Sequence, residues 1–291
     1  MKPAPFSYHT ATSVKEAVDL LADLGPDSRV LAGGQSLMPM MNFRLARPSH
    51  LIDVNPVTEL DYVRRDNGEV VIGARTRQSA LEASAVVRER LPFLGEAVRH
   101  VAFPTIRHRG TVGGSVAHAD PGGELPTALL ALDARMVVTG PNGIRTIAAA
   151  EFFQGPYETA LAPGDLLTEI RAEPWPENAG YAFCEFMRAY HGWAVVGVGA
   201  LLELDGRQVR RAAVALCGVG GAPVRAPLAE ARLVGSVADD AAIAEAAAAA
   251  ADGTEPWSDV HGSSAYRRKL AGVYVRRALY QARERAGGGT R

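Results

Sequence analysis

Two short glycine-rich segments constrain this chain more than any other feature of its sequence. They are residues 32–39 (AGGQSLMP) and residues 111–121 (TVGGSVAHADP), and each follows an apolar stretch and contains a Gly-Gly pair. Because glycine has no Cβ and tolerates positive φ, such segments let free backbone N–H groups approach an anion closely. The two segments predict two walls around one diphosphate group. Neither contains G-x-G-x-x-G or G-x-x-x-x-G-K-[ST], which argues against Rossmann and P-loop folds.

The composition is that of a globular chain with room for two domains. Of its 291 residues, 47% are hydrophobic and 22% are charged, and the formal net charge is −1. This balance implies neither a nucleic-acid partner nor an anionic membrane surface. The strongly apolar stretch 194–204 is too short to cross a bilayer, so no transmembrane segment is expected. The N-terminal residues lack the apolar region of a signal peptide, so we expect a cytoplasmic location.

The chain has only two cysteines, Cys184 and Cys217, which are far apart and form no C-x-x-C pair. Two thiolates cannot hold an iron–sulfur cluster that needs four, nor complete an all-cysteine zinc site. A disulfide between them is disfavoured in a reducing compartment, and we expect two packed thiols. The sequence offers no metal-ligating constellation and no nucleophile–base pair. Any iron–sulfur or molybdenum chemistry would therefore belong to another chain.

The hydrophobic pattern predicts a mixture of helices and strands. Ser13 is a predicted N-cap with Glu16 three positions later. Predicted helices cover residues 13–24, 76–84, 86–90, 93–100, 125–132, 239–251 and 265–284. Predicted strands cover residues 29–31, 51–54, 70–72, 135–139 with a hairpin to 147, 166–171, 181–188, 194–204 and 209–217. Residues 173–178 (EPWPEN) mark a boundary between domains, and residues 287–291 are expected to fray.

These segments together resemble the FAD-binding medium subunits of molybdenum hydroxylases. That family includes the flavoprotein chain of aerobic carbon monoxide dehydrogenase and the FAD domain of xanthine dehydrogenase. The resemblance covers nearly the whole chain. Besides the two glycine-rich segments, it is carried by residues 52–55 (IDVN), 71–74 (VIGA) with Thr76, 107–110 (RHRG), 124–126 (ELP) and 259–268 (DVHGSSAYRR).

The resemblance implies an α+β fold in which a vanillyl-alcohol-oxidase (PCMH) type FAD-binding domain of two lobes precedes a smaller C-terminal domain. We expect the FAD-binding domain over residues 1–177, with lobes of about 1–55 and 56–177. The C-terminal domain is expected over residues 178–291, with a three-stranded antiparallel sheet and helices. Asp205-Gly206 is the predicted turn between its second and third strands.

The resemblance also implies a set of FAD-binding residues. The first glycine-rich segment would hold the pyrophosphate, the second would contact diphosphate, ribityl chain and ring, and flanking residues would line the cofactor. The set is Ala32, Gly33, Gly34, Gln35, Ser36, Leu37, Ala102, Ile106, Thr111, Gly113, Gly114, Ser115, His118, Asp120, Glu124, Leu167 and Trp193.

Several of these side chains also have purely structural interpretations. His118 fits a buried hydrogen-bonded histidine, and Asp120 fits a residue that shapes a turn before Pro121. Glu124 fits a first-turn helix carboxylate, or a carboxylate that accepts a hydrogen bond from the flavin imide or a ribityl hydroxyl. Trp193 either flanks the isoalloxazine or belongs to the core of the second domain.

Two groups of basic residues also have two interpretations each. Arg107 and Arg109 are interpreted as solvated loop charges, with a partner chain or the phosphates as the alternative. Residues 267–269 and 276–277 (RRK and RR) are interpreted as a solvated helix face, with a subunit contact as the alternative. The methionine cluster at residues 38–41 is interpreted as core packing.

One region departs from the family pattern. Many relatives carry a lysine, then Gly-Asp and an aromatic residue, near the flavin ring, whereas this chain has Glu185, His191-Gly192 and Trp193. The missing lysine changes the charge expected beside the ring, and hence bears on the flavin potential and the electron acceptor.

The resemblance implies an electron-transfer role with no catalytic side chain of its own. A small partner chain would carry two [2Fe–2S] clusters and pass electrons to this FAD. A large partner would hold the molybdenum cofactor, and the complex would be a dimer of heterotrimers. The external acceptor would be a quinone, NAD or oxygen. The alternatives are a stand-alone flavin oxidase of the same fold and a non-catalytic assembly protein that has kept it.

Overall fold

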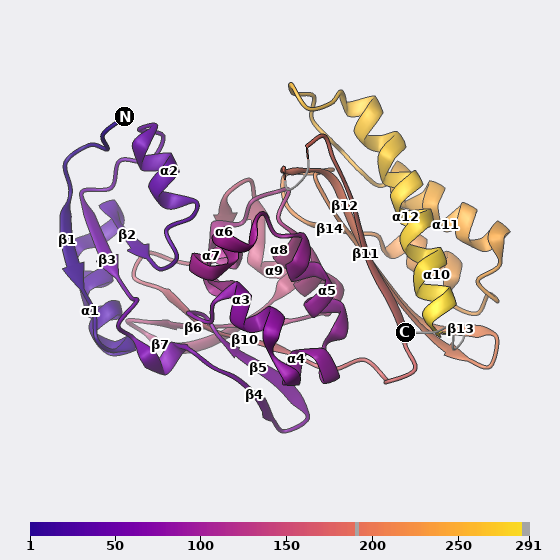
Figure 1. Ribbon diagram of the computed structural model, residues 1–291, viewed down its shortest axis with the longest axis horizontal. Helices are drawn as coiled ribbons and strands as arrows, with labels where there is room; N and C mark the ends of the chain where they lie inside the picture. Colours follow the sequence, from indigo (N-terminus) through magenta and orange to yellow (C-terminus); the bar gives the residue numbers. More distant parts are fainter. Residues whose placement is uncertain (190–191, 287–291) are drawn as a thin grey trace.

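The computed structural model describes residues 1–189 and 192–286, and it has three successive parts along its long axis (Figure 1). A small N-terminal lobe is followed by a larger central lobe and then by a sheet covered with helices. His191 and the predicted frayed tail at 287–291 lie outside the described residues. Within the described residues, no helix is both long and apolar enough to cross a membrane.

The N-terminal lobe is a three-stranded parallel sheet with strand order β1-β3-β2. Its elements are β1 (Ser7–Thr10), α1 (Val14–Leu24), η1 (Gly25–Asp27), β2 (Ser28–Leu31), α2 (Leu37–Asn42) and β3 (His50–Asp53). Helix α1 begins as predicted, because the Ser13 hydroxyl accepts from the Glu16 amide at 3.1 Å. It ends at Gly25, where φ is +70°.

The central lobe is built on a five-stranded sheet with strand order β4-β5-β10-β6-β7 and antiparallel pairing throughout. Its strands are β4 (Val63–Asp66), β5 (Glu69–Gly73), β6 (Arg135–Gly140), β7 (Gly143–Ala148) and β10 (Leu166–Ala172), after η2 (Thr58–Leu60). Between β5 and β6 lie α3 (Gln78–Ala83), α4 (Ala85–Arg90), α5 (Pro92–His100), α6 (Pro104–Arg109), α7 (Val112–His118) and α8 (Glu124–Ala131). Before β10 come α9 (Ala149–Phe152), β8 (Phe153–Gly155) and β9 (Glu158–Thr159).

The C-terminal part is a four-stranded antiparallel sheet, so the predicted three strands were one too few. Its elements are β11 (Gly180–Met187), β12 (Ala194–Asp205), β13 (Gln208–Cys217), β14 (Val224–Arg225), α10 (Pro227–Leu233), α11 (Asp240–Asp252) and α12 (Ser264–Ala286). The fourth strand was missed because it has two residues and lies just before Pro227, which is too short for a period-2 pattern.

The sheet of the C-terminal part is covered on both faces. Helices α10–α12 lie on the outer face (Figure 1), where Val198, Leu202 and Leu279 share one apolar cluster. On the inner face, Phe183 and Leu201 belong to the same buried cluster as residues of α5 and α8. Burial on both faces explains why 194–202 is a continuous apolar run rather than an alternating strand. The domain boundary that we propose at residue 177 lies between β10 and β11.

Two predictions about the glycine-rich segments need correction. The second segment was expected to be a loop, but Val112–His118 form the helix α7. The Thr111 side chain caps that helix by accepting from the Gly114 amide at 3.1 Å, which offsets the low helix propensity of its two glycines. In the first segment, only residues 32–36 are loop, since α2 begins at Leu37.

Candidate functional site

The first glycine-rich segment presents a row of unused backbone donors. The amides of Gly33, Gly34, Gln35, Ser36 and Leu37 donate no hydrogen bond to any described residue. The chain turns here because Gly34 has φ of +72°, a conformation that residues with a side chain rarely adopt. Successive backbone N–H groups without an acceptor can form a concavity that binds an anion. The prediction of free amides is therefore confirmed for this segment.

The loop is held in place by Asn55, which follows β3. The Asn55 amide Nδ2 donates to the Ala32 carbonyl at 2.8 Å and to Asp53 Oδ1 at 2.5 Å. Asp53 also accepts the hydroxyl of Tyr8 from β1. Through these hydrogen bonds, residues 52–55, which carry part of the family resemblance, lie beside the loop and hold it.

The two glycine-rich segments meet at Gly33. A Cβ at that position would lie 2.4 Å from the Arg109 carbonyl oxygen and 2.8 Å from the Gly110 Cα. The segment that leads into α7 therefore packs directly against the first loop, and glycine is required there by this close approach. Figure 1 shows α6 and α7 on the side of the central lobe that faces α2.

The amides around the Gly-Gly pair of the second segment donate to other atoms of the protein. Gly113 N donates to the Ala74 carbonyl at 2.8 Å, Gly114 N donates to Thr111, and Ser115 N donates to the Thr111 carbonyl at 3.1 Å. A Cβ on Gly113 would lie 2.5 Å from the Cβ of Ala74, so this glycine serves helix packing. The prediction of free amides was therefore wrong for Gly113, Gly114 and Ser115.

Arg77 joins the two segments and was not predicted as a site residue. Its guanidinium donates to Asn55 Oδ1 at 2.6 Å and to the Arg109 carbonyl. Burial lowers its pKa, as do the charges of Arg109 and Arg75. Arg75 is paired with Asp61, but neither Arg77 nor Arg109 has an ion pair with a described carboxylate. The Arg77 guanidinium thus lies beside the backbone that packs against the first loop, and the charges of Asp61 and Asp53 oppose the lowering of its pKa.

The end of α7 and the start of α8 carry three of the predicted site residues. The His118 ring lies 5.0 Å from that of Tyr157, and burial lowers its pKa. Asp120 Oδ1 accepts from Gly122 N at 2.8 Å, which supports the turn-shaping interpretation. Glu124 begins α8 at its N-terminus. Burial of its carboxyl, followed by the charge of Glu185, raises its pKa to about 8.

Glu185, where the family pattern has lysine, is a buried carboxyl. Its side chain on β11 is 1% exposed, and neither carboxyl oxygen has a hydrogen-bond partner. The His100 ring at the end of α5 lies close by, with Nδ1 3.4 Å from Glu185 Oε1. The sequence identified this position only through the departure from the family pattern.

The remaining predicted site residues differ in how exposed they are. Ala102, with φ of +40°, and Ile106 are partly exposed around the start of α6. The Leu167 side chain is buried in the central core. Trp193 is 79% exposed and meets the His261 ring at 6.4 Å, so its interpretation as a core indole was wrong.

Two arginines interpreted as solvated are buried. Arg107 is 6% exposed, and it donates to the carbonyls of Val101 and Ala102 at 3.0 Å and pairs with Glu82. Arg267 is 3% exposed within α12. Arg109 and residues 268–269 and 276–277 are exposed as interpreted. In the methionine cluster, Met41 is buried in the core.

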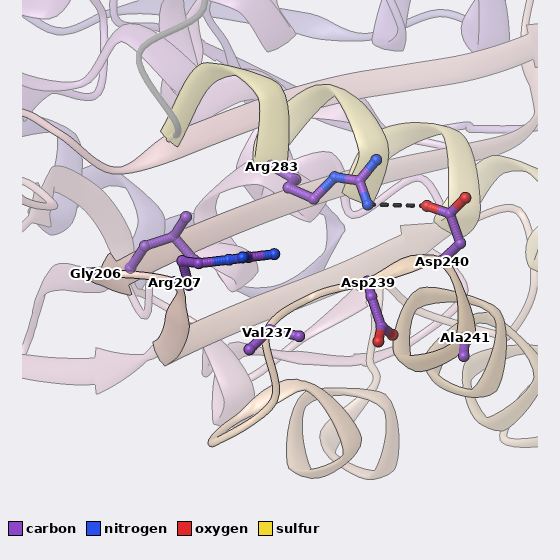
Figure 2. Close-up of a pocket in the computed structure, with 8 residues that line it drawn as sticks. Gly206, Arg207, Val237, Asp239, Asp240, Ala241 and Arg283 are labelled. Atoms are coloured by element: carbon purple, nitrogen blue, oxygen red, sulfur yellow. Dashed lines mark hydrogen bonds and ion pairs between the residues drawn. The ribbon is translucent and has the colours of Figure 1, made fainter.

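A surface hollow of about 730 Å³ lies far along the chain from these residues (Figure 2). It is formed by the turn between β12 and β13, the start of α11 and the end of α12. Its polar groups are largely paired, because Arg283 donates to Asp240 at 3.0 Å and Asp239 caps α11. No predicted site residue lines it.

The described residues contain no group of three or more His, Cys, Asp or Glu side chains arranged to hold a metal ion. Cys184 and Cys217 are both free thiols, and burial raises the pKa of each.

The two-lobed α+β domain with its loop of free amides, and the helix-covered sheet that follows it, each match a family of known proteins. Residues 4–172 match the family described as the FAD binding domain in molybdopterin dehydrogenase. Residues 181–282 match the CO dehydrogenase flavoprotein C-terminal domain. The chain therefore belongs to the family of FAD-binding medium subunits of molybdenum hydroxylases.

Relatives resemble the chain over its whole length. The carbon monoxide dehydrogenase medium chain of Hydrogenophaga pseudoflava is 40% identical over 279 residues, which cover 96% of this chain and 97% of the relative. A solved structure of carbon monoxide dehydrogenase from the same organism, which lacks the Mo-pyranopterin moiety of the molybdenum cofactor, contains a chain of the same fold. That chain matches with a TM-score of 0.96 at 42% identity, and the match covers 98% of this chain and 99% of the other. Quinoline 2-oxidoreductase from Pseudomonas putida 86 matches with a TM-score of 0.93 at 37% identity, covering 99% of each chain.

Proposed function

We propose that this chain is the FAD-binding electron-transfer subunit of a three-chain molybdenum hydroxylase. One observation carries the proposal: among the described residues, the consecutive amides from Gly33 to Leu37 have no acceptor, and the Arg77 guanidinium is held beside them by the Arg109 carbonyl. A buried pyrophosphate needs donors and positive charge to replace its water, and this arrangement supplies both. The donor set therefore fits the diphosphate of FAD.

In this proposal the chain binds and orients the cofactor. The loop of residues 33–37 would hold the pyrophosphate, with the Ser36 hydroxyl as a further donor. The side chains of Ser115, His118 and Glu124 would face the rest of FAD, and the exposed Trp193 would flank the entrance. When bound, FAD supplies the redox chemistry, because the protein contributes binding, orientation and electrostatics.

We further propose that a small partner chain with two [2Fe–2S] clusters feeds electrons to this FAD. A large chain would hold the molybdenum cofactor and the substrate site, in a dimer of heterotrimers. Support comes from the full-length similarity to a carbon monoxide dehydrogenase medium chain and to a chain of quinoline 2-oxidoreductase. We propose a cytoplasmic location for the complex.

The test is flavin stoichiometry in the native complex and in single variants. We expect FAD, molybdenum and iron to co-purify with this chain, and Gly33→Ala to lose FAD because its Cβ would overlap the Arg109 carbonyl. The matched control is Gly180→Ala, whose Cβ would overlap the Ala282 carbonyl in the C-terminal part. A complex without FAD, or equal FAD loss in both variants, would contradict the pyrophosphate assignment. A flavin-loaded chain without partners would favour the stand-alone oxidase.

A further inference from the structure

The side-chain amide of Asn55 joins the loop of residues 33–37 to the Arg77 guanidinium. Its Nδ2 donates to the Ala32 carbonyl, which precedes the loop, at 2.8 Å, and its Oδ1 accepts from Arg77 at 2.6 Å. A carbonyl oxygen only accepts and a guanidinium only donates, so these two partners fix which end of the amide faces which neighbour. One amide group therefore sets the position of the loop and of the cation together.

The rest of Asn55 is held just as firmly. Its backbone N–H donates to Asp53 Oδ1 at 2.8 Å, and its carbonyl accepts from Arg75 Nε at 2.7 Å. Its side-chain Nδ2 also donates to Asp53 Oδ1, at 2.5 Å. Every polar group of Asn55 thus has a partner within the protein. Any effect of Asn55 on a ligand therefore acts through the groups that it holds.

This arrangement leaves the charge of Arg77 uncancelled. Among the described residues, no carboxylate forms an ion pair with Arg77. Asp61 pairs with Arg75 instead. Asp53 is engaged by Asn55, which places its neutral amide oxygen, rather than a carboxylate, against the guanidinium. A diphosphate at the free amides would therefore meet a cation that no contact ion pair has neutralised.

We propose that Asn55 is a positioning residue for a diphosphate ligand, because its neutral amide orients the loop and holds Arg77 without cancelling its charge. Arg77 also donates to the Arg109 carbonyl, against which Gly33 packs, so the guanidinium is held at two points beside the loop. The inference rests on the proposed function only in naming FAD as the diphosphate that is bound.

Asn55→Asp tests the proposal because it keeps the shape of the side chain and replaces its NH2 group by an oxygen. The new carboxylate turns an acceptor toward the Ala32 carbonyl and gives Arg77 the ion partner that it lacks. We expect the affinity of the flavin-free full chain for ADP and for FAD to fall by about 10- to 100-fold at about pH 8. Isothermal titration measures both. Asn142→Asp, in the exposed turn between β6 and β7, is the matched control and should bind as wild type.

The pH profile of Asn55→Asp distinguishes this role from a merely structural one. Its two carboxyls, at positions 53 and 55, lie within hydrogen-bond distance, which favours the uptake of a proton. A protonated carboxyl at position 55 is again neutral and can again donate. Relative to wild type at the same pH, its affinity for ADP should therefore recover by about tenfold between about pH 8 and pH 5. Asn55→Ala has no group to protonate and should stay weakened at each pH.

The double variant Asp53→Asn/Asn55→Asp moves the carboxylate two positions along the chain at constant net charge. It avoids two adjoining carboxyls, so it carries the test if the single variant folds poorly. Because the carboxylate now pairs with Arg77, we expect the affinity for ADP to fall by about 10- to 100-fold, with no recovery at low pH.

ADP separates the failure of this inference from the failure of the proposed function. A chain that binds ADP with the expected dependence on Asn55 but takes up no FAD would overturn the proposed function and support the inference. The inference is overturned if the Asn55 variants bind ADP and FAD as wild type does. It is also overturned if the affinity of Asn55→Asp relative to wild type is the same at both pH values, or if the double variant binds ADP as wild type does.

Discussion

At the scale of single residues, the arginines of this protein are held in place by groups that are distant in sequence. Arg77 is placed by Asn55 and by the Arg109 carbonyl, and Arg107 is enclosed by the carbonyls that end α5. The sequence around Arg77 has no motif that separates it from a solvated arginine. The Gly-Gly pair at 33 and 34 could be recognised in the sequence, and the positive φ of Gly34 is a local need, whereas glycine is required at 33 by the carbonyl of the distant Arg109.

We expect Arg77→Met to weaken FAD binding by about 10- to 100-fold, since a hydrogen bond to a charged group contributes about 1.5–3 kcal/mol. Arg77→Lys keeps the charge and should bind FAD with an intermediate affinity. Isothermal titration of the flavin-free chain measures both. Arg276→Met, which removes an exposed arginine on α12, should leave the affinity unchanged. Equal affinities in Arg77→Met and wild type would remove Arg77 from the site.

Arg267 is a structural arginine, and its loss should destabilise the C-terminal part. It donates to the Val195 carbonyl at 2.6 Å and to the Gly218 carbonyl at 3.1 Å, and it pairs with Asp259 at 2.7 Å. Arg267→Met removes the guanidinium donor from both carbonyls and one of the donors to Asp259, and it should lower the free energy of unfolding by about 3–5 kcal/mol. Denaturant unfolding measures this loss, with the exposed Lys269→Met as control. A change below about 1 kcal/mol would contradict it.

The pH dependence of that loss has a defined sign. Burial raises the pKa of Asp259, but hydrogen bonds from Arg267, His261 N and Trp257 outweigh it and hold the pKa well below its ordinary value. A lowered folded-state pKa gives stability that is complete above the unfolded value of about 3.9 and is lost as pH falls further. The difference in free energy of unfolding between wild type and Arg267→Met should therefore become smaller below pH 4.

At the scale of elements, the sequence predicted those helices and strands whose signals are local. Helix α1 has its N-cap and its terminal glycine, and β12 and β13 are joined by the Asp205-Gly206 turn. Helix α7 was missed because two adjacent glycines favour a loop. Its stability comes from the Thr111 cap and from packing of Gly113 on Ala74, which belongs to a segment nearly forty positions earlier.

Thr111→Val tests the cap, because valine has a similar shape and no acceptor. We expect the free energy of unfolding to fall by about 1 kcal/mol and the melting temperature by about 2–4 °C. Thr111→Ser should restore most of the loss, and Thr105→Val, at an exposed position, should have no effect. A melting temperature equal to wild type in Thr111→Val would show that Gly114 N finds another acceptor.

At the scale of the whole molecule, the inner face of the C-terminal sheet completes the core of the central lobe. Phe93 on α5 lies between the two, with ring centroids 6.3 Å from Phe183 and 6.5 Å from Tyr181. Glu96 adds a polar link, since it accepts from Phe183 N at 2.8 Å and pairs with Arg285 at 2.7 Å. The sequence predicted both domains but not this contact, because apolar residues on a strand do not specify which helix they meet.

This shared core predicts that the central lobe and the C-terminal part unfold together. Phe93→Ala should leave a cavity between them and lower the free energy of unfolding by about 3–5 kcal/mol. Because Phe93 contacts both sides, hydrogen exchange should quicken to a similar extent in α8 and in β12, and calorimetry should still show one transition. Phe93→Leu, which keeps most of the apolar contact, should lose less. If exchange quickened in α8 alone, or if two transitions separated in Phe93→Ala, the two parts would be independent folding units joined only by a surface contact.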